Sequence, residues 1–188
     1  MIKLYGRMVP MLVRATGQPV ICATEPVASQ FRVLPHDIDI NRHLNNGRYL
    51  QWMDVNRAEW LIRTGILSVV RRNRWKPILG SVAMNYRREL CLWERAIVET
   101  RLLGWDNRWT YLEHRVTNEG GRAVAIGIAK AGFRTQGRWV DPEILRLQLP
   151  YALHAMVLPQ HALALLAFDK HADACHHEDK VKKRLALS

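Results

Sequence analysis

The sequence predicts an α+β domain in which one long helix is followed by an antiparallel sheet. Apolar residues recur at helical spacing between Asn46 and Thr64, and from Ser81 onwards they alternate with a period of two. Consecutive strands joined by short turns form an antiparallel meander, so one helix followed by such strands indicates the α+β class. The 188 residues, 48% of them hydrophobic, are enough for one domain with a real core.

The first predicted strand and the helix flank a polar loop. Ala28–Leu34 is the strand, and a proline follows it. After the loop, Asn45 or Asn46 can cap the helix, because an Asn side chain accepts hydrogen bonds from the free N–H groups of the first turn. We expect the helix to continue to about Thr64 and Gly65 to stop it.

Four further strands are predicted after the helix. They are Ser81–Arg88, Ala96–Trp105, Arg108–Thr117 and Ala123–Phe133. Asp106-Asn107 and Asn118-Glu119-Gly120-Gly121 are turn sequences between them. Ala125, Gly127 and Ala129 share one face of the last strand, and these small side chains leave room for a helix to pack closely.

The chain divides into three parts on this pattern. Residues 1–27 form an N-terminal extension, residues 28–140 the α+β domain, and residues 141–188 a helical C-terminal extension. In the last part, Asp141-Pro142-Glu143 is typical of a helix start with Pro at its first position, and Gln160–His176 predicts a second, amphipathic helix.

The net charge of +11 raises the question of an anionic partner. Much of the surplus comes from the segment Arg63–Arg88, which holds seven Lys or Arg residues and no acidic residue. Such a cluster suits a small anionic ligand or a polymer, or it forms a solvated face. Because the sequence contains no zinc finger, helix-turn-helix cue or RNA-recognition aromatic motif, we do not expect a nucleic-acid partner.

The cysteines and the apolar stretches bear on the compartment. Cys22, Cys91 and Cys175 are widely spaced and include no C-x-x-C pair, which argues against a disulfide framework or a thiolate zinc site. His171, Cys175, His176 and His177 have helical spacing but no visible fourth ligand, so no metal site is predicted. No stretch reaches the length of a membrane helix, and no signal-peptide core is visible. We therefore expect a cytoplasmic protein without a membrane span.

The polar loop before the helix carries the residues most suited to chemistry. Asp37–Tyr49 packs two carboxylates, several carboxamides and His43 directly before a helix N-terminus. Free N–H groups there suit a carbonyl oxygen that gains negative charge, and an Asp can act as nucleophile or activate water. These are the parts needed for acyl transfer, although a capped helix beside solvated Asp residues has the same composition. A calcium loop is rejected, since its pattern wants a Gly and an acid where Arg42 and Arg48 stand.

The same stretch resembles the signature of a known superfamily. Asp37-Ile38-Asp39-Ile40-Asn41-Arg42-His43-Leu44-Asn45-Asn46-Gly47-Arg48-Tyr49-Leu50 is similar to the D-x-D-x-x-x-H-x-N-N-x-x-Y-L motif of hotdog-fold thioesterases of the 4-hydroxybenzoyl-CoA thioesterase-like family. Plant acyl-ACP thioesterases resemble it through D-x-N-x-H. The resemblance covers about residues 28–140 and implies a hotdog fold, an antiparallel sheet wrapped around one long helix. It implies an acyl-CoA or acyl-ACP thioester hydrolase of fatty acid metabolism.

Residue roles follow from this resemblance position by position. Asp39 matches the catalytic carboxylate, and Asn46 matches the residue whose backbone N–H polarises the thioester carbonyl. Asn41 and His43 match the carboxamide and imidazole of the acyl-ACP branch. The Gly that usually precedes the His is Arg42 here, and no counterpart of the further downstream acid or Cys of the acyl-ACP enzymes is visible.

The resemblance also gives the basic cluster a role. Coenzyme A carries phosphate groups that Arg binds through paired hydrogen bonds, so the candidates are Arg71, Arg72, Arg74, Arg87 and Arg88. Coenzyme A enters as part of the substrate, and no other cofactor is expected. The resemblance implies a homodimer or homotetramer. A hotdog protein that binds an acyl group or CoA without turnover remains an alternative, because fold does not fix function.

Overall fold

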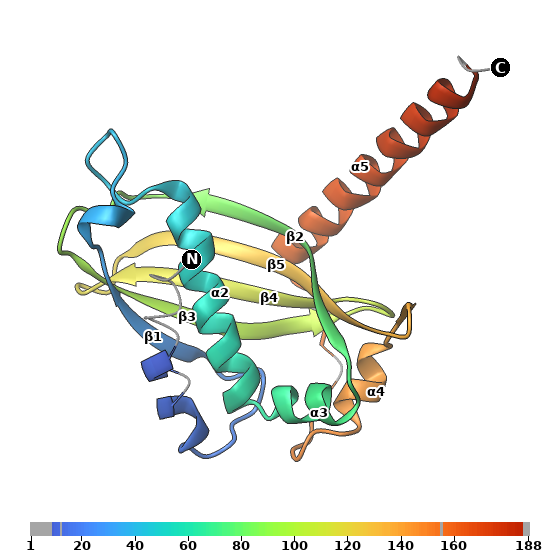
Figure 1. Ribbon diagram of the computed structural model, residues 1–188, viewed down its shortest axis with the longest axis horizontal. Coiled ribbons are helices and arrows are strands. Elements are labelled where there is room, and N and C mark those ends of the chain that lie inside the picture. Colours follow the sequence, from blue (N-terminus) through green and yellow to red (C-terminus); the bar gives the residue numbers. More distant parts are fainter. Residues whose placement is uncertain (1–8, 12, 155, 186–188) are drawn as a thin grey trace.

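The computed structural model describes the backbone of residues 9–11, 13–154 and 156–185 and, of these, the side chains up to residue 172. One curled antiparallel sheet forms the body of the molecule (Figure 1). A long helix lies across one face of the sheet, and the C-terminal helix starts on the opposite face and projects away from it. The α+β class and the hotdog arrangement predicted from the sequence are confirmed.

Three successive strands of the sheet form a meander, and the two strands that precede them in the chain pair with its two sides. In chain order the elements are β1 (Val27–Arg32), the 3-10 helix η1 (Pro35–Asp37), α2 (Asn46–Arg63), α3 (Ile66–Arg72), β2 (Lys76–Tyr86), β3 (Arg95–Trp105), β4 (Thr110–Asn118), β5 (Ala123–Thr135), β6 (Arg138–Trp139), α4 (Pro142–Arg146) and α5 (Gln160–Leu185). The strand order in the sheet is β1-β3-β4-β5-β2, and β6 pairs with β5. β1 and β2 are therefore the two edge strands.

The central helix α2 begins and ends where local signals predict. The side chain of Asn45 accepts a hydrogen bond from the Gly47 N–H at 2.9 Å, which makes Asn45 the N-cap. Gly65 adopts φ of 72°, a left-handed conformation that costs glycine little, and the chain turns there into α3. The turn at Asn118 is also formed as predicted, with Gly121 at φ of 72°.

Two features between the central helix and the sheet differ from the prediction. Ile66, Val69 and Val70 bury one face of the short helix α3, which the sequence pattern did not reveal. β2 begins at Lys76 rather than Ser81, and its register with β5 shifts between Leu79 and Ser81. Such a bulge interrupts the alternation of side chains, so the first part of the strand has no period of two in the sequence.

A layer of polar side chains crosses the interior between two apolar clusters. One cluster surrounds Trp52 and Leu90 near the start of α2, and the other surrounds Trp60 and Leu112 near its end. Between them lie Ser29, Asn56, Thr100 and His114, all buried and joined by hydrogen bonds. The hydrogen bonds among these side chains offset part of the cost of burying them.

The C-terminal part of the chain packs onto the sheet at two places. α4 and the following turn place Leu145 and Leu153 in the apolar cluster around Trp60. The first turns of α5 cover the other face of the sheet through Ala162 and Leu165. This part is helical, as predicted, and α5 extends beyond the predicted His176. Among the described residues, no helix combines the length and the apolar character needed to cross a membrane.

Candidate functional site

The polar loop folds back on itself as a narrow hairpin before α2. Ile38 and Leu44 form an isolated antiparallel bridge, and the Asp39 N–H donates to the His43 carbonyl at 3.0 Å. Arg42 closes the turn with φ of 64°. Left-handed backbone costs a residue with a side chain roughly 1–2 kcal/mol, which explains why a Gly suits this position. The chain keeps an Arg there and still makes the turn.

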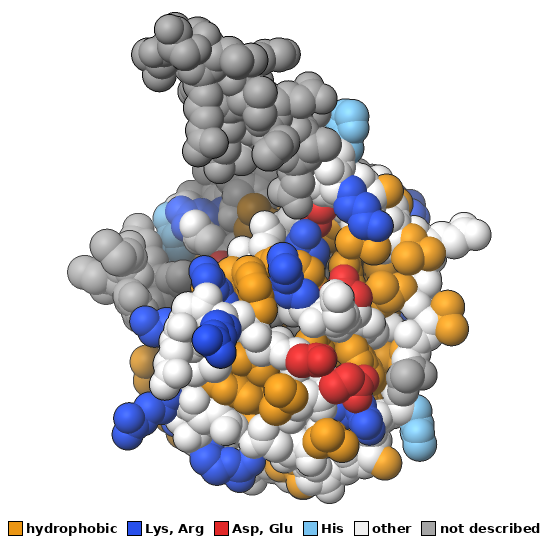
Figure 2. All heavy atoms as spheres, turned by 90° about the vertical axis from the view of Figure 1, so that its right-hand side faces the viewer, with side chains coloured by type: hydrophobic (Ala, Val, Ile, Leu, Met, Phe, Trp, Pro, Cys, Tyr) orange, Lys and Arg blue, Asp and Glu red, His pale blue; other side chains and the backbone are white. Residues whose placement is uncertain are grey.

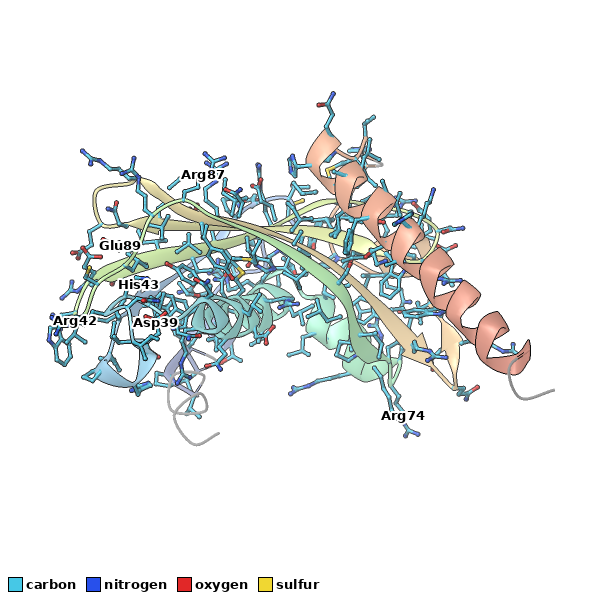
Figure 3. All side chains as sticks on the ribbon, turned by 90° about the horizontal axis from the view of Figure 1, so that it is seen from above. Asp39, Arg42, His43, Arg74, Arg87 and Glu89 are labelled. Atoms are coloured by element: carbon cyan, nitrogen blue, oxygen red, sulfur yellow. The ribbon has the colours of Figure 1, made fainter. Side chains whose placement is uncertain are left out.

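Three of the four predicted catalytic residues meet in this hairpin. The Asp39 carboxylate accepts the Asn41 N–H at 2.8 Å through Oδ1, and its Oδ2 lies 3.6 Å from His43 Nδ1. Both side chains keep partial access to solvent, 19% for Asp39 and 29% for His43. Asn41 contributes its backbone N–H, and its side chain is exposed. Figure 3 shows Asp39, Arg42 and His43 together at one end of the molecule.

The other carboxylate of the motif, Asp37, has a structural environment. It is 1% exposed and accepts the Leu34 N–H at 3.0 Å. His36 Nε2 and Arg48 Nε lie 3.3 and 3.6 Å from its Oδ1. The Asn45 N–H donates to the Asp37 carbonyl at 2.9 Å. Asp37 thus fixes the loop to the start of α2, while Asp39 remains accessible.

The helix start supplies the fourth predicted residue, Asn46. The Gly47 and Arg48 N–H groups are both bonded to Asn45, through its side chain and its carbonyl. The Asn46 N–H has no acceptor among the described residues. It lies at the positive end of an 18-residue helix, where an oxygen that gains negative charge is stabilised.

A hollow of about 230 Å³ opens beside this helix start. His43, Leu44, Asn46 and Tyr49 line it on one side, and Tyr86, Arg87, Arg88 and Glu89 line it on the other. The Tyr86 hydroxyl donates to the Asn46 carbonyl at 3.2 Å, which ties the end of β2 to the start of α2. Burial raises the pKa of Tyr86 and, more strongly, that of Tyr49, so both hydroxyls stay protonated at neutral pH. The motif spacing did not reveal Tyr86 as a neighbour of the site.

The predicted arginine cluster is divided by the fold. Arg87 and Arg88 border the hollow, whereas Arg71, Arg72 and Arg74 precede β2 at its other end. The eleven-residue strand separates the two groups by about 30 Å at a rise of ~3.3 Å per residue. Figure 3 shows Arg74 at the end of the molecule opposite Arg87. The expectation of one local cluster beside the catalytic loop is therefore wrong within a single chain.

The end of the molecule that carries α3 and α4 does not collect positive charge in one patch. In Figure 2 the Lys and Arg side chains there lie dispersed among hydrophobic and neutral ones. Arg72 donates to the Gln148 side chain at 3.1 Å, which gives it a structural contact with the C-terminal segment. Among the side chains that the structure describes, this face presents no continuous basic surface to a broad anionic polymer.

The buried polar layer contains a histidine in an unusual environment, His114. It is fully buried, and its Nδ1 lies 2.7 Å from the Thr100 hydroxyl. Because that hydroxyl donates to Asn56, His114 Nδ1–H must donate to it, and Nε2 remains an acceptor without a partner among the described residues. Burial, together with the nearby charge of Arg57, lowers the pKa of His114 to about 3.

Metal chemistry finds no support in the described residues. They contain no group of three or more His, Cys, Asp or Glu side chains that could hold an ion. The side chains of Cys175, His176 and His177 lie outside the described residues.

Comparison with known proteins shows the family to which the chain is similar. The model of the thioesterase-like superfamily matches residues 33–159. Protein THEM6 of Xenopus laevis is 39% identical over 83 residues, which are 44% of this chain and 40% of that protein. The L-carnitine dehydrogenase/betainyl-CoA thioesterase of Agrobacterium fabrum is 32% identical over 90 residues, or 48% of this chain and 19% of that protein. The matches to THEM6 proteins span half of those relatives or less.

A solved structure gives the same fold. The crystal structure of YbaW, a probable thioesterase from Escherichia coli, superposes with a TM-score of 0.60 at 21% identity, covering 64% of this chain and 94% of that one. At 21% identity this likeness establishes the hotdog fold alone. The chemistry has to be inferred from the residues of the loop.

Proposed function

The chain belongs to the thioesterase-like superfamily, and from this premise we propose that it hydrolyses acyl thioesters. One observation carries the proposal. Asn46, whose N–H has no acceptor among the described residues, lines a hollow that His43 also lines, and the Asp39 carboxylate lies 3.6 Å from His43. A hydrogen-bond donor for the carbonyl oxygen and a carboxylate on the same hairpin are the two groups that hydrolysis requires.

In the proposed reaction the thioester carbonyl oxygen accepts the Asn46 N–H. Asp39 takes a proton from water, and the hydroxide forms a bond to the carbonyl carbon. When the tetrahedral intermediate collapses, the carbon–sulfur bond breaks and the thiolate leaves with the proton. Alternatively the Asp39 carboxylate attacks the carbonyl itself, and water then hydrolyses the anhydride. In a single turnover in oxygen-labelled water, an unlabelled first acid together with label in Asp39 identifies an anhydride that water opens at the Asp39 carboxyl carbon. Direct attack of water labels the acid and leaves Asp39 unlabelled.

The neighbours of Asp39 position it. The Asn41 N–H donates to Asp39 Oδ1, and His43 Nδ1 lies 3.6 Å from Oδ2, so each carboxylate oxygen has a defined neighbour. Tyr86 holds the carbonyl of Asn46 and so fixes the peptide at the helix start. Preorganised donors of this kind are effective because they need no rearrangement when charge develops.

Coenzyme A is the proposed carrier in preference to acyl carrier protein. Arg87 and Arg88 border the hollow, where a guanidinium can pair with a phosphate group. We place a second copy of the chain on the free edge of β2. Antiparallel pairing of two β2 strands brings Arg71, Arg72 and Arg74 of one subunit near Arg87 and Arg88 of the other. The five arginines then act together across a homodimer.

The cysteines favour a reducing compartment such as the cytoplasm. Cys22 and Cys91 are free thiols, and neither lies in a predicted metal or redox motif. Burial and the nearby carboxylates of Glu94 and Glu89 raise the pKa of Cys91, so its thiol is a weak nucleophile.

The experiment is a thiol-release assay with acyl-CoA and acyl-ACP substrates on the full chain and on Asp39→Asn. Asn keeps the acceptor for the Asn41 N–H and removes the charge. We expect turnover to fall by roughly 10²–10⁴-fold, with unchanged circular dichroism. Asp54→Asn, which alters an exposed carboxylate on α2, is the matched control. Equal cleavage by Asp39→Asn and the parent protein would overturn the role of Asp39, and binding without cleavage by the parent protein would identify a non-catalytic acyl-binding protein.

A further inference from the structure

Two loops at the end of the molecule that carries Asp39 are joined to each other. One is the hairpin of residues 38–44, and the other is the loop of residues 87–94 between β2 and β3. His43 and Cys91 form an isolated antiparallel bridge, and the Leu44 N–H donates to the Leu90 carbonyl at 2.8 Å. Figure 1 shows both loops at the same end of the sheet. Because Leu44 and Leu90 are buried, the two loops share a fixed base.

The tips of these loops expose large apolar side chains. Ile40 in the hairpin is 97% exposed, and Leu92 and Trp93 in the other loop are 40% and 52% exposed. Arg42 and Leu92 flank the bridged pair on the same side, so the two tips lie together. We call Ile40, Arg42, Leu92 and Trp93 the tip surface. A single exposed apolar residue is ordinary, but three on joined loops form a patch.

Two residues of the tip surface have a strained backbone. Arg42 has φ of 64°, and Trp93 has φ of 71°. Glycine adopts this left-handed conformation at little cost, whereas a bulky side chain is rare there. Of the four non-glycine residues with this backbone in the described part of the chain, two therefore lie in these loops. The chain displays an Arg and a Trp at positions where Gly would fold more easily.

Trp93 is held in place by its own backbone. Its N–H donates to the Val33 carbonyl at 3.0 Å, and its carbonyl accepts a hydrogen bond from Arg32 Nε at 3.1 Å. The Arg32 guanidinium carbon lies 5.8 Å from the centre of the indole ring. A side chain that is displayed on a fixed backbone loses little conformational freedom when it binds a partner.

The position of Trp93 argues against a second copy of the chain as that partner. Val33 follows β1, and β1 is the edge strand on the side of the sheet opposite to β2. Pairing of two copies along β2 therefore leaves Trp93 uncovered. Ile40 protrudes almost completely into solvent, a shape that suits insertion into a soft surface.

Positive charge prevails around the tips. The cations of the two loops and their flanks are Arg32, Arg42, Arg87, Arg88 and Arg95, and the acids are Asp39, Glu89 and Glu94. Asp39 and Glu94 accept the backbone N–H groups of Asn41 and Cys91 at 2.8 Å, so both are turned onto their own loops. Arg95 also lies 3.6 Å from Glu119. Apolar tips among arginines match a bilayer with anionic headgroups, because binding there gains from apolar burial and from charge.

We propose that the tip surface docks onto a membrane that carries anionic phospholipids. Ile40 and Leu92 enter the apolar layer, and Trp93 lies at the level of the headgroups. Arg42 contacts phosphate groups there. The hollow at Asn46 then opens close to the lipid surface, because His43 lines it and belongs to the same hairpin. This docking goes beyond thioester hydrolysis and needs no turnover.

The test is sedimentation of the full chain with vesicles of phosphatidylcholine, alone or mixed with an equal amount of phosphatidylglycerol. We expect binding to the mixed vesicles that weakens with added salt. Ile40→Ser and Trp93→Gly should each lower the partition coefficient by about tenfold. Arg42→Gly should lower it by about fivefold. The Tm of the two glycine variants should not fall, because glycine relieves the backbone strain, whereas loss of a structural contact would lower it.

The chain offers matched controls away from the tip surface. Arg74 is an exposed arginine with φ of 55°, and Figure 3 shows it at the opposite end of the molecule from Arg42. Arg74→Gly therefore removes the same charge and relieves similar strain. Val157 is 95% exposed, so Val157→Ser is the control for Ile40→Ser. Both controls should leave the partition coefficient unchanged.

Several outcomes overturn the inference. One is failure of the parent protein to sediment with the mixed vesicles, and another is equal weakening by the controls and the tip variants. Dissociation of an oligomer by Ile40→Ser or Trp93→Gly, seen by light scattering, would identify a contact between subunits instead. Capture by an acidic acyl carrier protein without vesicle binding would identify a protein partner. Because no thioester is cleaved in this measurement, docking and hydrolysis stand or fail separately.

Discussion

The guanidinium of Arg48 lies 3.6 Å from the buried carboxylate of Asp37 and donates at 2.8 Å to the carbonyl of His36. This contact joins the first turn of α2 to the 3-10 helix η1, which precedes the hairpin of Asp39 and His43. Two aspartates two residues apart thus have different tasks. Asp37 anchors the loop to the start of α2. Asp39 lies in the hairpin and remains partly accessible to solvent.

We predict that Asp37→Ala destabilises the fold, whereas Asp39→Asn does not. The Ala substitution leaves the Leu34 N–H and the Arg48 charge without their acceptor inside the loop. Loss of a buried partner of a charged group costs about 2–4 kcal/mol in the free energy of unfolding. Urea unfolding measures it. Equal stability of Asp37→Ala and Asp39→Asn would show that the two carboxylates are interchangeable.

His114 should make stability depend on pH. Its pKa in the folded protein is about 3, against an ordinary value of 6.5, because it is buried and lies near Arg57. The unfolded chain therefore binds a proton between these values that the folded protein does not, so stability is lost as pH falls through this window. Between pH ~7 and ~5 the loss amounts to about 2 kcal/mol.

The measurement compares the full chain with His114→Gln by urea unfolding at both pH values. Gln keeps a donor for the Thr100 hydroxyl and does not titrate. We expect the stability difference between the two proteins to shift by about 2 kcal/mol in favour of the variant at the lower pH. A parallel pH dependence of the two proteins would mean that His114 is protonated in the folded state.

For the loop before α2, the sequence predicted the helix cap, and the family resemblance predicted that Asn41 and His43 accompany Asp39. Both predictions concern contacts between residues that lie close in sequence. Asn45 caps the helix within two residues, and Asp39 meets Asn41 and His43 within four. The helix stop at Gly65 depends on the backbone of one residue. The cap and the contacts of Asp39 are made by residues that the motif itself contains, and the helix stop is made by the single glycine that follows the helix.

The features that the sequence did not reveal depend on distant residues. The five arginines looked like one cluster because α3 and the bulged first half of β2 have no clear periodic pattern. The network that includes His114 draws its other members from β1, α2 and β3, so no spacing in the sequence marks His114 as one of them. Tyr86 reaches Asn46 only because β2 ends beside the helix start.

We predict that Arg87 and Arg88 bind the phosphate groups of coenzyme A. Replacing both with Ala should raise KM for acyl-CoA by about 10- to 100-fold, since a hydrogen bond to a charged group contributes roughly 1.5–3 kcal/mol. Turnover at saturation should change little, because neither side chain touches the thioester in the proposed reaction. Arg138→Ala, an exposed arginine in β6, is the control. The rise in KM should become smaller with added salt, because salt screens the charges. An unchanged KM would show that Arg87 and Arg88 do not bind coenzyme A.

The divided arginine cluster gives the sharpest test of the subunit arrangement. Replacing Arg71, Arg72 and Arg74 together with Ala should raise KM about tenfold if these side chains reach the coenzyme A site of the partner. This triple variant keeps its catalytic hairpin, and the Asp39→Asn variant keeps its arginines. A mixed dimer that pairs through β2 then contains one intact site, which combines the hairpin of the triple variant with the arginines of the Asp39→Asn chain. We expect mixing after partial unfolding and refolding to recover activity at low acyl-CoA concentration that neither variant shows alone. A triple variant mixed with itself is the control. If the mixture only averages the two variants while light scattering shows a dimer, the arginines before β2 do not serve the site of the partner.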